Sequence, residues 1–180
     1  MQAWEIDIAT VTNQTYGAYT ALAVTALQSL ATKDTDVYTG WQSARIDNLT
    51  SVKADDYEII ISLPTAATAP AGTSAVIVYL IPWVVAADGT TWAPAANFGT
   101  VTLPSGADAA ANISDPNSMR FAASLPYKIT SQTINGFITV AALCGGIVPD
   151  AWSLAVSNRT GAALSTGCVI AYRPITYTHT

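Results

Sequence analysis

Short runs rich in Val, Ile, Thr and Tyr recur along the chain, and clusters of Gly, Pro, Asn and Asp separate them. Runs of this kind are typical of β-strands that end in turns. The clearest runs predict strands over 57–63, 74–85, 119–125, 133–140, 151–157 and 168–177. Pro82 lies in the second run. Because proline cannot donate to a sheet ladder, we expect this strand to bend, bulge or lie at an edge there.

Other segments carry weaker signals. Residues 20–31 fit both a helical face and a period of two, and their threonine content favours a strand. Residues 39–47 alternate and should end at Asp47. The NRTG sequence at 158–161 predicts a turn that closes a hairpin, with Gly161 in the left-handed conformation.

The spacing of eight or nine such runs, without a convincing long helix, predicts an all-β fold. We expect an antiparallel, jelly-roll-like β-sandwich. Parallel strands are not expected, because no amphipathic helices separate the runs. A chain of 180 residues fits one domain. We therefore predict an N-terminal arm over residues 1–19, a single sandwich domain over 20–180, and a long loop excursion near 86–115.

The composition narrows the classes of partner. Hydrophobic residues make up 51% and charged residues 11% of the chain, whereas ordinary globular chains contain about 25% charged residues. A composition this apolar and this weakly charged excludes a disordered chain. With 7 basic and 12 acidic residues the net charge is −5, so we expect neither nucleic acid nor a membrane as a partner. No signal peptide is evident, and we expect the chain to be made and folded in a cytoplasm.

The sequence lacks the patterns of common active and metal sites. His179 is the only histidine and lies beside the C-terminus, where a general base is poorly held. Cys144 and Cys168 do not cluster with it as zinc ligands would. We predict no catalytic, cofactor-binding or metal-binding residues and no enzymatic activity. The two cysteines are interpreted as buried small hydrophobic residues, and a single disulfide is the alternative if their strands are neighbours.

Two groups of acidic residues are the remaining candidates for chemistry. Asp34 and Asp36 lie in a polar loop, and Asp55, Asp56 and Glu58 precede a predicted strand. Many glycosidases use a pair of carboxylates, and calcium binds hard oxygen ligands. Both groups flank turns, however, where Asp is favoured for its hydrogen bonds to the backbone. We therefore interpret them as turn residues.

The tryptophans separate by context. Trp41, Trp83 and Trp152 lie in strand-like runs, so we expect them in the core or in packing between subunits. Trp4 lies in the arm and Trp92 in the long excursion, where a neighbouring subunit would supply a surface for packing. We take five aromatic residues as candidates for an interface with another protein: Trp4, Tyr16, Tyr19, Trp92 and Phe98.

Three stretches together resemble a known family. Residues 40–48 (GWQSARIDN) carry a small residue and a serine followed by Asp-Asn, and residues 76–80 (VIVYL) are similar to a VxVY strand. The most specific block is a Gly-Gly pair, a Val-Pro pair, a Trp and the run VSNRTGAAL, at 145–146, 148–149, 152 and 156–164. Over residues 20–165, roughly, the chain resembles the capsid decoration or cement proteins of tailed bacteriophages.

The resemblance implies a non-enzymatic, jelly-roll-like virion protein. Such a protein sits as a homotrimer on the outside of the icosahedral shell, binds the major capsid protein, and reaches the capsid exterior after synthesis in the host cytoplasm. The expected action is mechanical, because a subunit that bridges capsid proteins adds association free energy that expansion must break. The alternative is a glycan- or host-receptor-binding module of a phage tail or fibre, which exposed aromatic residues beside Asp and Asn loops would favour.

Overall fold

A computed structural model describes residues 11–32, 39–49, 53–69, 74–94, 106–113 and 119–179 of the chain. Trp4 and Phe98, two of the candidate interface residues, lie outside the described residues. Asp34 and Asp36, the first acidic group, lie outside them as well.

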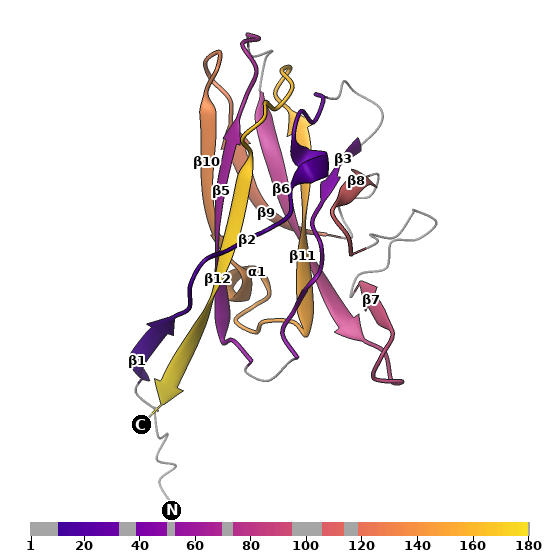
Figure 1. Ribbon diagram of the computed structural model, residues 1–180. Coiled ribbons are helices and arrows are strands. Elements are labelled where there is room, and N and C mark those ends of the chain that lie inside the picture. Colours follow the sequence, from indigo (N-terminus) through magenta and orange to yellow (C-terminus); the bar gives the residue numbers. More distant parts are fainter. Residues whose placement is uncertain are drawn as a thin grey trace, which may run out of the picture.

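The described strands form an antiparallel β-sandwich (Figure 1), as predicted. Sheet A has the spatial order β1 (Val11–Tyr16), β12 (Val169–His179), β5 (Asp56–Pro64) and β10 (Thr133–Thr139), and β2 (Thr20–Ala21) also pairs with β12. Sheet B has the order β7 (Trp92–Pro94), β6 (Ala75–Val85), β11 (Ala151–Arg159), β3 (Thr39–Gln42) and β8 (Ala109–Asn112). In sheet B, β9 (Arg120–Pro126) also pairs with β6, and β4 (Ile46–Asp47) with β11.

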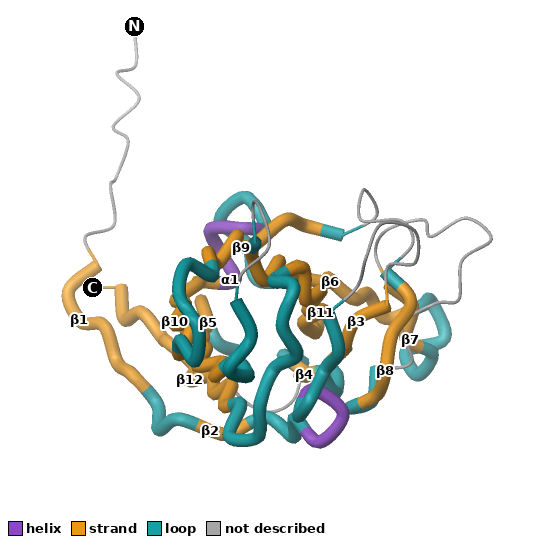
Figure 2. Tube along the Cα trace, turned by 90° about the horizontal axis from the view of Figure 1, so that it is seen from above, coloured by secondary structure: helices purple, strands orange, loops and turns teal. Residues whose placement is uncertain are grey.

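The main core fills the space between the two sheets. Figure 2 shows β5, β10 and β12 on one side and β6, β11 and β3 on the other. Alternation along the strands directs Ile59 and Ile61 of β5 toward Val78 and Leu80 of β6, and Trp152 of β11 is fully buried between them. Each such aliphatic side chain contributes roughly 1.5–3 kcal/mol on burial.

Strand β6 is buried on both faces. Tyr79, Ile81 and Trp83 point away from the main core into a second cluster on the outer face of sheet B. Burial of both faces explains why this strand is an almost unbroken apolar run. On the edge opposite β11, β9 pairs with Ala75–Leu80 and β7 with Trp83–Val85. Pro82 lies in the gap between these two partners, so the expected edge-like position is confirmed.

The predicted strand over 20–31 is wrong. Strand β2 covers only Thr20–Ala21, and a 3-10 helix, η1 (Thr25–Leu27), follows it. The carboxylate of Asp108 accepts the backbone N–H of Thr25 at 2.8 Å. This long-range contact satisfies a donor at the start of the helical turn, and no local periodicity reveals it.

The predicted strand over 39–47 is interrupted, although its end at Asp47 is confirmed. Strands β3 and β4 pair separately with β11. Between them, the Ser43 hydroxyl oxygen accepts the backbone N–H of Leu154 at 2.9 Å. The Arg45 backbone N–H leaves the sheet and donates to the carbonyl of Gly106 at 3.0 Å.

The predicted hairpin at 158–161 is also wrong. Strand β11 belongs to sheet B and β12 to sheet A, so this connection crosses between the sheets. The left-handed conformation of Gly161 is confirmed, with a φ of 79°. A short helix, α1 (Val140–Leu143), and the left-handed glycines Gly145 and Gly146 form the connection from β10 to β11.

Candidate functional site

Arg173 of β12 is the centre of an aromatic cluster on the outer face of sheet A. Its guanidinium carbon lies 4.2 Å from the ring centre of Tyr16 and 4.7 Å from that of Tyr19. A cation over an aromatic face is attracted to it, which holds the two rings around the guanidinium. The tyrosines remain 45% and 43% exposed. The structure thus brings together two of the predicted interface residues.

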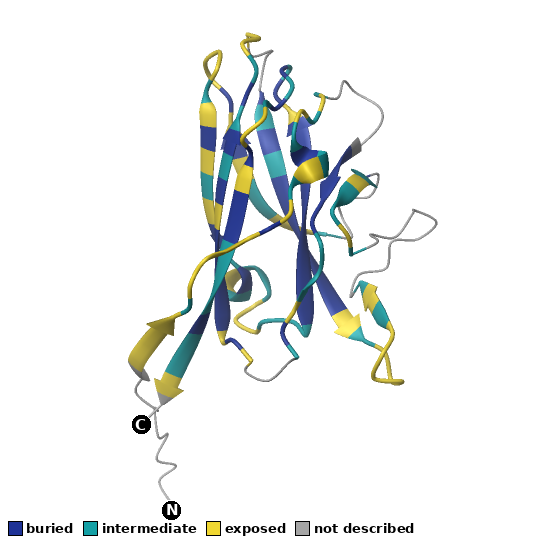
Figure 3. Ribbon diagram, in the orientation of Figure 1, coloured by how far each residue is buried: buried dark blue, intermediate teal, exposed yellow. Residues whose placement is uncertain are grey.

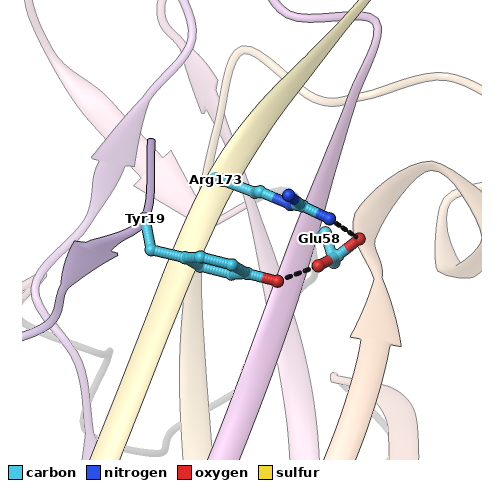
Figure 4. A network of polar contacts seen from close by, with 3 residues as sticks. All are labelled: Tyr19, Glu58 and Arg173. Carbon is cyan, nitrogen blue, oxygen red and sulfur yellow. Dashed lines mark hydrogen bonds and ion pairs between the residues drawn. The ribbon is translucent and has the colours of Figure 1, made fainter. Parts of the chain in front are cut away.

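Glu58 of β5 completes this cluster (Figure 4). It is the direct cross-strand partner of Arg173, whose Nη2 donates to Glu58 Oε2 at 2.9 Å. The Tyr19 hydroxyl donates to the other carboxylate oxygen. The hydrogen bond from Arg173 lowers the pKa of Glu58, and the hydrogen bond to Glu58 raises the pKa of Tyr19. The cluster is therefore an ion pair with a neutral phenol at neutral pH.

An apolar patch, Ile60, Phe137 and Val169, lies on the same face of sheet A. Their exposed fractions are 37%, 60% and 47%. Ile60 is the cross-strand partner of Phe137, and Val169 pairs with Ser62, two residues along β5 from Ile60. Figure 3 shows buried and exposed positions alternating along β10, the strand that carries Phe137.

The apolar patch borders a shallow depression of about 260 Å³. Its lining consists of Ile60, Ile61, Ser62, Asn135, Gly136 and Val169. None of these residues carries an acidic, basic or imidazole side chain, and Ser62 has the only hydroxyl group among them. Exposed, contiguous apolar surface makes this face a candidate for contact with another molecule.

Trp92 lies in a different place from the tyrosines, because β7 belongs to sheet B. The Arg45 guanidinium carbon lies 4.3 Å from the Trp92 ring centre and 5.8 Å from that of Trp83. Trp83 itself is buried, and its Nε1 donates to the Ser153 hydroxyl oxygen at 2.8 Å. Trp92 therefore packs within the chain and stays half-buried.

The second acidic group has separate structural roles. Asp56 accepts the backbone N–H of Ala141 at 2.8 Å, at the start of α1. Asp55 accepts the backbone N–H of Tyr177 at 2.6 Å. Together with Glu58, which pairs with Arg173, these carboxylates bind groups from segments far away in the chain. The described part of the chain has no cluster of side chains suited to a metal ion.

Both cysteines are free. Cys168 is buried, and burial raises its pKa to about 11. Cys144 is half-buried, and burial raises its pKa as well. Neither thiol has the depressed pKa of a nucleophile.

Sequence reasoning singled out Glu58 but interpreted it as a turn residue, whereas it lies within β5. It missed Arg173 and the apolar patch. A signal for the patch was present, since Ile60 and Phe137 occupy the outward register of strands whose other outward positions are mostly polar. The pairing of Glu58 with Arg173 joins residues far apart in the chain, and only the register of β5 against β12 reveals it.

Comparison with protein families, with curated proteins and with solved structures finds no match for this chain. Within the described residues, no helix has the length and apolar character needed to cross a bilayer.

Proposed function

We propose that the protein is a structural, non-enzymatic component of a tailed-phage virion, which binds the outside of the capsid through the outer face of sheet A and stabilises the shell. The observation that carries the proposal is the apolar patch of Ile60, Phe137 and Val169 next to the cluster around Arg173. We take the major capsid protein as the partner because the motifs at 40–48, 76–80 and 145–164 resemble those of decoration proteins.

Two physical properties of this face support a protein partner. Tyr and Arg are enriched among the residues that dominate binding energy in interfaces, and an apolar centre is typical of them. Arg173 is held by Glu58 and by two aromatic rings before any partner arrives. A preordered side chain loses less conformational entropy on binding.

The proposed mechanism is the bridging of neighbouring capsid subunits. A sandwich bound across a joint adds interface free energy that outward pressure on the shell must overcome. Many copies at equivalent joints give a large total effect even when each contact is modest. The resemblance implies a homotrimer, and a trimer would make three sets of contacts with the capsid. Light scattering of the purified protein measures this oligomeric state.

The test is co-sedimentation of the protein with expanded heads that lack decoration proteins. We expect Phe137→Asp to weaken binding about tenfold or more, because a charge replaces the most exposed apolar side chain of the patch. Phe121→Asp is the matched control: Phe121 is 59% exposed, against 60% for Phe137, but it lies on β9 of sheet B. We expect that variant to bind within about twofold of the unchanged protein.

Equal binding by both variants would contradict the proposed face. Absence of any binding to heads, together with a positive glycan array or host-cell pull-down, would favour the alternative, a glycan- or receptor-binding module of a tail or fibre. Circular dichroism of both variants checks that each is folded.

A further inference from the structure

We propose that residues 11–21, which we call the strap, open separately from the sandwich, and that ionised Glu58 is the acid-sensitive group that keeps the strap closed. The strap consists of β1, β2 and the link between these strands. The inference concerns the isolated chain, so it does not rest on the proposed function.

The strap lies along one edge of sheet A. Among the described strands, both β1 and β2 pair with β12 alone. Between them, Gly17 donates its N–H to the carbonyl of Pro174 in β12 at 2.9 Å, and the side chains of Thr20 and Tyr172 form a hydrogen bond. A two-stranded ribbon is only marginally stable in water. An edge segment paired on one side therefore opens at a lower cost than a central strand.

The side chains of the strap add little burial to this backbone pairing. From Asn13 to Ala21, every residue except Gly17 is exposed (Figure 3). The next residue, Leu22, is buried in the main core and donates its N–H to the carbonyl of Ile170 at 2.9 Å. Since burial of apolar side chains is the main force that holds strands in place, we infer that the separately opening segment ends at Leu22.

Glu58 supports the side-chain contacts that hold the strap to the outer face of sheet A (Figure 4). The Tyr19 hydroxyl donates to one of its carboxylate oxygens, and Arg173 donates to the other at 2.9 Å. The rings of Tyr16 and Tyr19 pack on the same guanidinium. Glu58 thus accepts a hydrogen bond from the strap and also fixes the cation on which two strap rings lie.

The charge on Glu58 links these contacts to pH. The hydrogen bond from Arg173 lowers the pKa of Glu58, whereas a glutamate in an unfolded chain has a pKa of about 4.3. The contribution of Glu58 is therefore complete above that value and is lost as the pH falls through the lower, folded pKa. Protonated Glu58 has no charge to hold Arg173, so we expect the strap to open more often in acid.

The groups around Glu58 make it the acid-titrating member of this contact. Arg173 and the two strap tyrosines face it, and neither a guanidinium nor a phenol changes its charge in acid. Its cross-strand partner on β10 is Thr139, which has no charge. On β5 itself, the carboxylate of Asp56 accepts the backbone N–H of Ala141 instead. A variant that neutralises Glu58 at neutral pH separates its effect from that of its acidic neighbours.

The test is hydrogen–deuterium exchange of the full chain, read by NMR as protection factors of the Gly17 and Leu22 amides. Both amides donate to carbonyls of β12 at 2.9 Å, but only Gly17 belongs to the strap. We expect Gly17 to be about tenfold or more less protected than Leu22. In Glu58→Gln at neutral pH, Gly17 should lose protection about fivefold, while Leu22 stays within about twofold.

Two further variants separate the contacts. Tyr19→Phe keeps the ring on Arg173 and removes only the hydroxyl, so we expect a smaller loss at Gly17, about threefold. Asp88→Asn is the matched control, because Asp88 is also a hydrogen-bonded carboxylate but lies in the turn after β6, where it accepts the N–H groups of Thr90 and Thr91. Protection at Gly17 should stay within about twofold in that variant.

Acid supplies the second measurement. Between about pH 5 and about pH 3, protection of Gly17 should fall in the unchanged protein and fall less in Glu58→Gln, whose side chain does not titrate. The proposal is overturned if Gly17 is as protected as Leu22, or if Glu58→Gln leaves Gly17 unchanged or affects both amides equally. An equal acid response in both proteins, or an equal loss in Asp88→Asn, would overturn it as well.

Discussion

Asn158 shows how a single buried side chain can hold a crossing between the two sheets. It is fully buried, and its amide nitrogen donates to the carbonyls of Leu30 at 3.0 Å and Ala162 at 2.8 Å. Its amide oxygen accepts the backbone N–H of Thr160 at 3.1 Å and the Thr160 hydroxyl at 2.7 Å. Removing these partners leaves backbone groups buried without hydrogen bonds.

We therefore expect Asn158→Ala to lower the free energy of unfolding by about 2–4 kcal/mol. Urea unfolding followed by tryptophan fluorescence measures the change. Asn135→Ala, at an exposed position of β10, is the control and should cost no more than about 0.5 kcal/mol. Equal losses for the two variants would show that the Asn158 network does not stabilise the fold.

At the scale of the element, the close approach of β3 to β11 depends on Gly40. A Cβ atom at this position would lie 2.2 Å from the carbonyl oxygen of Val156 and 2.3 Å from Cδ1 of Ile113. The first of these atoms is backbone and cannot move aside without disturbing β11. The glycine is required here for its small size.

Gly40→Ala is expected to cost about 2–3 kcal/mol of stability or more, because β3 must move away from β11. Thermal or urea unfolding measures the loss. Gly145→Ala is the comparison, because a Cβ there meets nothing within 4 Å and the cost is limited to a left-handed φ of 75°, about 1–2 kcal/mol. A smaller loss at Gly40 than at Gly145 would contradict this account.

The strands with clear alternation or long apolar runs were predictable, since burial of a strand face leaves a pattern in the sequence. β2 and η1 were not, because a carboxylate from residue 108 sets the backbone of Thr25. The hairpin at 158–161 failed for a related reason: a turn sequence specifies the turn itself and does not specify which sheet the next strand joins.

The candidate site was predictable only in part. Tyr16 and Tyr19 were among the five aromatic residues predicted for an interface, and both lie in the predicted arm. Their partners Glu58 and Arg173 come from strands whose pairing joins distant parts of the chain. Trp92 was predicted for an interface because a tryptophan in the long excursion needs a surface to pack on, but Arg45 covers its ring. Whether an aromatic side chain packs internally depends on such tertiary neighbours.

At the scale of the whole molecule, the main core makes stability sensitive to alkaline pH. Burial raises the pKa of Cys168 to about 11 and that of Tyr57 to about 12. In the unfolded chain these groups ionise near about 8.5 and 10. Above these values the unfolded chain holds fewer protons than the folded chain, so stability falls as pH rises.

We expect the free energy of unfolding to decrease steadily between about pH 9 and pH 11. Urea unfolding at a series of pH values measures it. Cys168→Ala removes the first of the two ionisations and should flatten the lower part of this decline. A stability that stays level or rises between pH 9 and pH 11 would contradict the burial of these two groups.

The proposed role of the whole molecule rests on the outer face of sheet A meeting a viral shell. A reconstruction of expanded heads saturated with the protein tests this most directly. We predict that Ile60 and Phe137 lie within about 4.5 Å of capsid protein atoms, with Arg173 at the same contact. A reconstruction in which this face points to solvent, or in which the protein is absent from the head, would contradict the account.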